Sequence, residues 1–229
     1  MKWSVEDFVY GATDGAITTF AVVAGVIGAS LSPQIVLILG FANLLADGLS
    51  MSIGSYLSGK TQIEYVQKER RKEEWAIDNM VEEETNEIRE IYKNKGFDNE
   101  LLDEIVKVIT SKKKIWVDTM MKEELGLIEN NKSPLDIAVT TFSAFNIIGL
   151  IPLIPFIIFF FSGISITSNN TFLLSIIFTA IAFFAIGVIK GKIVKKSPLI
   201  SGLSTVGIGG IAAFVAYIIG YLLNMLVNL

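Results

Sequence analysis

Residues 33–57, PQIVLILGFANLLADGLSMSIGSYL, form an apolar stretch long enough to cross a membrane as one helix. A helix needs roughly 20 apolar residues to cross the ~30 Å hydrocarbon core of a bilayer. The one charged residue in this stretch is Asp47, and a carboxylate inside a bilayer is costly and typical of a functional site. The stretch therefore predicts a membrane-spanning helix that carries a polar site.

Hydropathy predicts five such spans. Hydrophobic residues make up 52% of the 229 residues, and the mean hydropathy is +0.56, too apolar for a soluble domain. Pro152 and Pro155 are expected to bend the third span and leave backbone carbonyls free within the bilayer. The spans are predicted at about residues 8–30, 33–57, 134–161, 172–189 and 199–226.

A polar insert separates the second and third spans and holds most of the 19 basic and 23 acidic residues. No proline interrupts the chain after the second span, so that helix is expected to continue to about residue 75. Shorter helices are expected at 82–92, ending at Lys95-Gly96, then at 98–109 and 113–124. The predicted organisation is spans one and two in 1–59, the insert in 60–132, and spans three to five in 133–229.

The basic residues indicate the orientation. Those outside the insert lie before the first span and between the fourth and fifth, so all lie on one face if the N-terminus is cytoplasmic. We therefore expect an all-α membrane protein with its N-terminus inside, its C-terminus outside and its insert in the cytoplasm.

Composition excludes several kinds of chemistry. The chain has no cysteine and no histidine, which excludes thiolate clusters, zinc held by imidazole, and Cys or His nucleophiles. Every lysine lies at the end of a span or outside it, so no Ser/Lys pair is available within the membrane. We expect no enzymatic activity, no prosthetic group and no nucleic-acid partner.

A candidate ion site lies in the first two spans. Asn43, Asp47 and Met51 are spaced four residues apart and share one helix face. Counting from the cytoplasmic ends places Asp14 opposite Met51, ~9 Å deep, with Asp47 ~6 Å deeper. Oxygen ligands with a thioether favour a divalent transition metal, and burial disfavours a charged carboxylate, which would couple transport to protons. The alternative is that both acids are protonated and bonded to a neighbouring carbonyl or hydroxyl group, such as that of Thr18. Glycines allow close helix approach here, at positions 11, 15, 25, 28, 40, 48 and 54.

The insert offers a second group of acids and methionines. Such acids usually form a solvated face with lysine partners, and lysines from Lys68 to Lys72 are available here. Two adjacent methionines beside a glutamate, on a helix expected to be exposed and amphipathic, are less typical of a solvated face. The group consists of Glu69, Glu73, Glu84, Glu87, Met120, Met121 and Glu124.

Four motifs resemble those of the vacuolar iron transporter (VIT) family: DGAITTFAVVAGVIGAS (14–30), DGLSMSIGSYLS (47–58), WVDTMMKEELGL (116–127) and IPLIPF (151–156). They occur in the same order as in the family, and the resemblance covers nearly the whole chain. The resemblance implies five membrane helices per protomer, a homodimer with the ion path at its two-fold interface, and a cytoplasmic metal-binding domain. It also implies proton-coupled movement of Fe²⁺, and often of Mn²⁺ or related divalent metals, out of the cytoplasm. We expect the plasma membrane as the location. The alternative is a membrane-anchored metal sensor or store that transports nothing.

The same resemblance identifies ligands residue by residue. Asp14 and Met51 match the family's membrane ligands. The chain departs from the family pattern at Asn43, where a glutamate is common, and one hypothesis is that Asp47 replaces the lost charge. A second departure is Ala76, where the family has a further glutamate. Glu69 or Glu74 would compensate for the absence of that glutamate here. The matches to the cytoplasmic ligands are Glu73, Glu84, Glu87, Met120, Met121 and Glu124.

Overall fold

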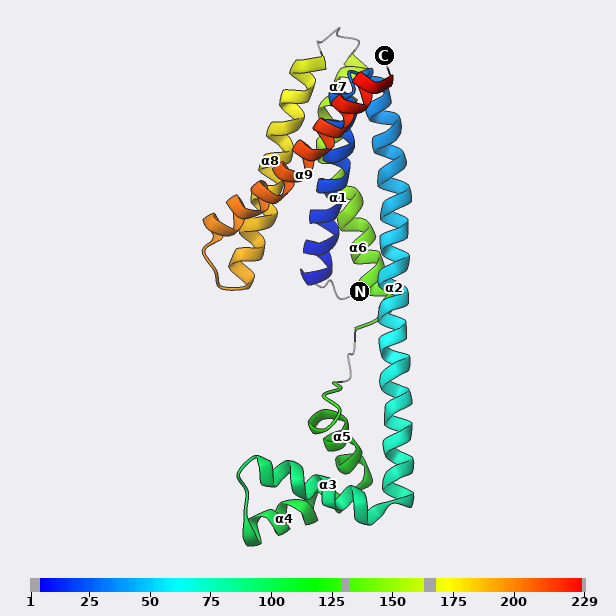
Figure 1. The fold of residues 1–229 in the computed structure, drawn as a ribbon, viewed down its shortest axis with the longest axis vertical. Coiled ribbons are helices and arrows are strands. Elements are labelled where there is room, and N and C mark those ends of the chain that lie inside the picture. Colours follow the sequence, from blue (N-terminus) through cyan, green and yellow to red (C-terminus); the bar gives the residue numbers. More distant parts are fainter. Residues whose placement is uncertain (1–4, 129–131, 163–167, 228–229) are drawn as a thin grey trace. The chain divides into compact units, whose positions relative to one another are not determined.

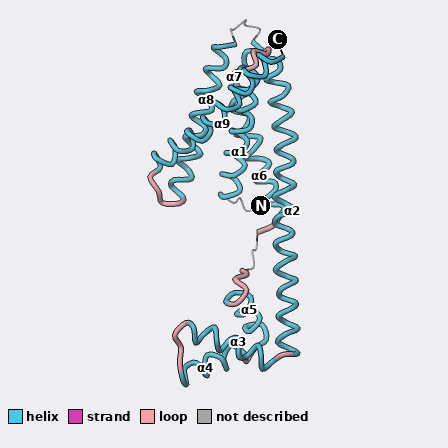
Figure 2. Tube along the Cα trace, in the orientation of Figure 1, coloured by secondary structure: helices cyan, strands magenta, loops and turns pink. Residues whose placement is uncertain are grey.

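The computed structural model describes residues 5–128, 132–162 and 168–227, and within these ranges it contains helices and no strands (Figures 1 and 2). Five helical stretches in the described chain are long and apolar enough to cross a membrane, which confirms the predicted spans. The elements are α1 (Val5–Gly28), α2 (Pro33–Asn79), α3 (Val81–Asn94), α4 (Asn99–Thr110), α5 (Lys113–Glu123), α6 (Pro134–Gly149), the 3₁₀ turn η1 (Ile151–Leu153), α7 (Ile154–Ser162), α8 (Ser168–Ile193) and α9 (Pro198–Val227).

The third span is interrupted at its prolines, as the sequence predicts. Helix α6 ends at Gly149, and Pro152 lies in η1 before α7 begins at Ile154. Proline has no N–H to donate and its ring clashes with the preceding turn, so the regular helix cannot continue. The carbonyl of Pro152 accepts a hydrogen bond of 2.7 Å from the Ser175 hydroxyl on α8. The interruption therefore does not leave this carbonyl unsatisfied in an apolar environment.

The spans form one compact unit, which extends to Leu57 and resumes at Ser133. Helix α1 lies at its centre and contacts α6, α8, α9 and η1 (Figure 1). Glycines make these contacts close, because a Cβ on Gly15 would overlap the backbone of Phe145 on α6, and one on Gly28 would overlap the backbone of Tyr217 on α9. The expected close approach is confirmed for α1, whereas Gly54 on α2 has no neighbour within 4 Å among the described residues.

Residues Ser58–Lys132 form the second unit, which contains the C-terminal part of α2 together with α3, α4 and α5. Helix α2 runs without interruption to Asn79, as the absence of proline predicts. Helix α3 ends before Gly96, whose φ of 94° is accessible to glycine at little cost. Buried apolar residues from all four helices form the core: Val66, Ile77, Ile88, Leu102, Val106, Ile109, Trp116, Val117, Met120 and Met121.

Candidate functional site

The predicted polar face of α2 points toward the other membrane helices. Asn43, Asp47 and Met51 are all half-buried, whereas Leu45 and Leu49 on the opposite side are exposed. Met51 packs against the apolar core of the membrane unit. The spacing of four residues thus places a carboxylate, an amide and a thioether on one face of a membrane helix.

Hydrogen bonds connect this face to α1 beside Asp14. The Thr18 hydroxyl donates to the backbone carbonyl of Asp14 at 3.0 Å, and Asn43 Nδ2 donates to Thr18 Oγ1 at 3.3 Å. No described residue donates a hydrogen bond to the carboxylate of Asp14 or Asp47, so the expected alternative of a carboxyl group bonded to Thr18 is not observed. The two carboxylates remain available to a cation.

The relative level of the two helices differs from our prediction. Asn43 on α2 donates a hydrogen bond to Thr18 on α1, and the two consecutive spans run in opposite directions, so Asp14, one turn before Thr18, and Asp47, one turn after Asn43, fall at the same level. Asp14 therefore lies level with Asp47, and Met51 lies one turn further along α2, ~6 Å away. The prediction of Asp14 opposite Met51 was wrong by one turn, because an apolar stretch does not define the end of its helix to better than a few residues.

A second amide at this level was missed by the sequence analysis. Asn146 on α6 donates from Nδ2 to the Phe142 carbonyl at 2.9 Å. The same nitrogen lies 2.8 Å from the position that a Cβ on Gly48 would occupy, beside Asp47. The available signal was one amide within the apolar third span, together with a glycine on α2 where its side chain fits.

The second unit brings four glutamates together. Burial raises the pKa of Glu73, and the nearby Glu124 and Glu87 carboxylates raise it further. Burial and the charges of Glu87, Glu73 and Glu124 raise the pKa of Glu84 to about 7, and the pKa of Glu124 is raised by burial and by Glu87. One carboxylate oxygen on Glu73 and one on Glu84 are buried without a hydrogen-bond partner among the described residues. Such oxygens are stabilised by a proton or by a cation.

These carboxylates are neighbours without forming a closed ligand shell. No three acidic side chains in the described chain are close enough together to hold a metal ion as they stand. Met120 and Met121 are 0% and 3% exposed and belong to the core of the unit, so α5 is amphipathic as expected but its methionines lie on the buried face and not on the exposed one. Trp116 and Val117 precede them by one turn and are also buried, which gives α5 one apolar face against α2, α3 and α4.

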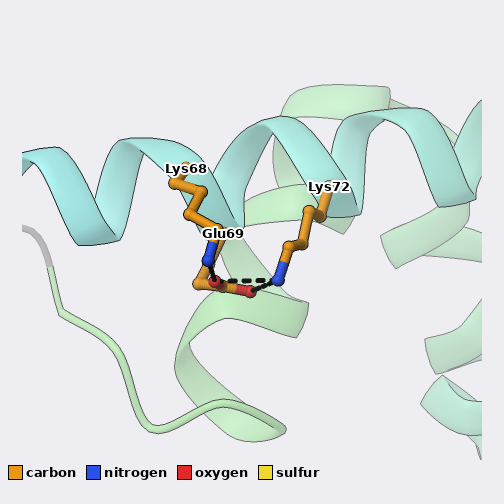
Figure 3. Close-up of polar contacts among 3 residues, drawn as sticks. All are labelled: Lys68, Glu69 and Lys72. Atoms are coloured by element: carbon orange, nitrogen blue, oxygen red, sulfur yellow. Dashed lines mark hydrogen bonds and ion pairs between the residues drawn. The ribbon is translucent and has the colours of Figure 1, made fainter.

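Glu69 differs from the four clustered glutamates. Its carboxylate accepts hydrogen bonds of 2.9 and 3.0 Å from Lys72 and lies 3.5 Å from Lys68 (Figure 3). The hydrogen bond from Lys72, with both lysine charges, lowers the pKa of Glu69. Ala76 shares a surface pocket with Glu73, Lys68, Arg71, Lys72 and Trp75. Of these described lining residues only Glu73 is acidic, and compensation by Glu69 or Glu74 stays a prediction.

Comparison with known proteins finds relatives over nearly the whole chain. The sequence pattern of the VIT family matches residues 5–221. A vacuolar iron transporter of Toxoplasma gondii is 38% identical over 228 residues, covering 98% of this chain and 76% of that protein. A vacuolar iron transporter of Plasmodium berghei is 35% identical, covering 97% and 83%, and vacuolar iron transporter 1 of Oryza sativa subsp. japonica is 33% identical, covering 93% and 82%. These relatives are named as transporters and not as enzymes. This chain is an integral membrane protein and belongs to the VIT family.

Proposed function

We propose that this protein moves Fe²⁺, and Mn²⁺ or related divalent transition metals, out of the cytoplasm in exchange for protons. The observation that carries the proposal is the pairing of Asp14 and Asp47 at one level between two spans, with Asn43 and Met51 on the same face. Two carboxylates balance the charge of one divalent cation, and the oxygen and thioether donors suit a transition metal. When the cation leaves, the two carboxylates repel each other, which favours uptake of a proton.

The orientation proposed is N-terminus inside and C-terminus outside, with the second unit in the cytoplasm. The lysine-rich turn between α8 and α9 and the many basic residues of Ser58–Lys132 support it through the positive-inside rule. Glu73, Glu84, Glu87 and Glu124 would then collect the cation before transport, while Met120 and Met121 fill the core of the unit. The relatives are named vacuolar, which does not support the plasma membrane that we expected.

Flux through purified protein in lipid vesicles tests this function. Vesicles that contain a divalent-metal indicator should show Mn²⁺ entry when a pH gradient is imposed, and the rate should fall when a protonophore collapses the gradient. Equal flux with and without the gradient would refute the exchange. Metal binding without any flux would instead support the sensor or store, which the transporter relatives do not favour.

The proposed homodimer predicts contact along an exposed face of α2. Ala42, Ala46, Ser50 and Gly54 are exposed and spaced four residues apart, a pattern of small residues that lets two membrane helices approach closely. Because the chain has no native cysteine, Ala46→Cys introduces a single thiol. Oxidation in membranes should then give a crosslinked dimer, whereas Ile181→Cys on the exposed face of α8 should remain monomeric on the gel. Equal crosslinking of both variants would argue against this interface.

A further inference from the structure

The two hydrogen bonds at Thr18 have a fixed direction. Thr18 Oγ1 lies 3.0 Å from the Asp14 carbonyl oxygen, which can only accept, so the single hydroxyl hydrogen is donated there. Asn43 approaches the same Oγ1 at 3.3 Å, where only lone pairs remain. Asn43 must therefore present its NH₂ group to Thr18.

This direction orients the whole amide of Asn43. The amide group is planar, with its nitrogen and oxygen on opposite branches, so binding of Nδ2 by Thr18 leaves Oδ1 directed away from the Thr18 hydroxyl. No described residue donates a hydrogen bond to that oxygen. Asn43 is half-buried on the α2 face that also carries Asp47, one turn away. The oxygen is thus left as an unused acceptor on the helix face that also carries Asp47.

Thr18 differs from the other hydrogen-bonded threonines of the membrane unit. Thr179 and Thr205 also donate to the carbonyl four residues earlier, at 2.7 and 3.0 Å, which is common for threonine inside helices. Neither accepts a hydrogen bond from another described helix, whereas Thr18 accepts one from α2. Bonding within its own helix therefore does not account for the link to Asn43.

We propose that Thr18 is a positioning residue that holds the Asn43 amide with its oxygen toward the transported cation. This inference rests on the proposed function and adds a neutral oxygen ligand to the charges of Asp14 and Asp47. If the link is lost, the amide can rotate and present its NH₂ group, which repels a cation. Groups that orient metal ligands typically contribute 10–100-fold to metal affinity.

The test compares Thr18→Val with Thr18→Ser in Mn²⁺ flux through lipid vesicles. Valine has nearly the same shape without the hydroxyl and should raise the KM for Mn²⁺ by about 10-fold or more, with a smaller change in maximal rate. Serine keeps both hydrogen bonds and should stay within about 2-fold of the native KM. Thr18→Ala, which adds no volume, replaces the valine variant if that protein does not fold.

A double variant separates positioning from packing. Asn43→Leu removes the amide, so Thr18→Val should add little to its KM if Thr18 acts through Asn43. Additive effects, or a native KM for Thr18→Val, would overturn the inference. Asp14→Ala separates failure of the positioning proposal from failure of the transport proposal. If Asp14→Ala loses flux while Thr18→Val keeps the native KM, the positioning role of Thr18 is refuted and the transport proposal stands. If the native protein moves no Mn²⁺, with or without a pH gradient, both proposals are refuted.

Discussion

Replacement of Asp14 by alanine is expected to abolish Mn²⁺ flux in lipid vesicles, with a loss of at least about 100-fold. Asp14 is one of two carboxylates that interact across α1 and α2, and no described side chain next to them carries a compensating charge. A divalent cation brought into a low-dielectric span without that charge loses several kcal/mol of stabilisation. The rate of metal entry, normalised to the amount of inserted protein, measures the effect.

Two further variants sharpen this prediction. Asp98→Ala removes a carboxylate that is exposed at the start of α4 and should leave flux unchanged. The pair Asn43→Asp and Asp47→Ala moves the acid by one turn, and recovery of flux beyond that of Asp47→Ala alone would support the hypothesis that Asp47 replaces the acid absent at Asn43. Wild-type flux from Asp14→Ala would reject the membrane site.

The second large effect concerns the stability of the unit Ser58–Lys132 as a function of pH. The pKa of Glu84 is about 7 in the folded unit and 4.5 in an unpaired glutamate. Between these values the folded state holds a proton that the unfolded state has lost. The resulting stabilisation is complete below pH 4.5 and is lost as the pH rises through 7. Stability should therefore fall between pH 4.5 and pH 7 and level off above pH 7, by about 1 kcal/mol or less once solvent screening is counted.

Tryptophan fluorescence during thermal unfolding of the full chain reports this change in a Trp3→Phe, Trp75→Phe background, which leaves the buried Trp116 as the one tryptophan. Glu84→Gln should remove part of the pH dependence, and the remainder should come from Glu73 and Glu124, whose pKa values are raised for the same reason. Glu90→Gln is the matched control, because Glu90 is exposed on the same helix and is not among the charges that raise the pKa of Glu84. Added Mn²⁺ should stabilise the native unit most at pH 8, where the cluster is ionised. An unfolding temperature that rises with pH, or an equal effect of Glu90→Gln, would contradict the prediction.

Much of the fold follows from local sequence properties, and the geometry of the site does not. The five spans, the long α2 and the break at Pro152 follow from hydropathy and from proline chemistry. The level of Asp14 against Asp47 depends instead on the side-chain link between Thr18 and Asn43, which no periodicity reveals. Asn146 was missed because its place depends on a third helix that packs against Gly48.

The methionines of α5 show a different kind of error. The spacing of Trp116, Val117, Met120 and Met121 is the pattern of a buried helix face, and it was available in the sequence. The prediction that the two thioethers are exposed ligands did not take this pattern into account. Methionine fills apolar cores readily, and in this unit both side chains do so.

The close helix contacts of α1 also limit how this protein can be engineered. Replacement of helical glycines by alanine commonly makes a protein more heat-resistant, since it reduces the disorder of the unfolded chain. At Gly15, Gly28 and Gly220 the added methyl group would overlap backbone atoms of a neighbouring helix. Gly207 and Gly210 on α9 have no described atom within 4 Å of the added carbon. A thermostable variant for crystallisation is therefore better sought on α9 at these two positions than at Gly11, Gly15 or Gly28 on α1.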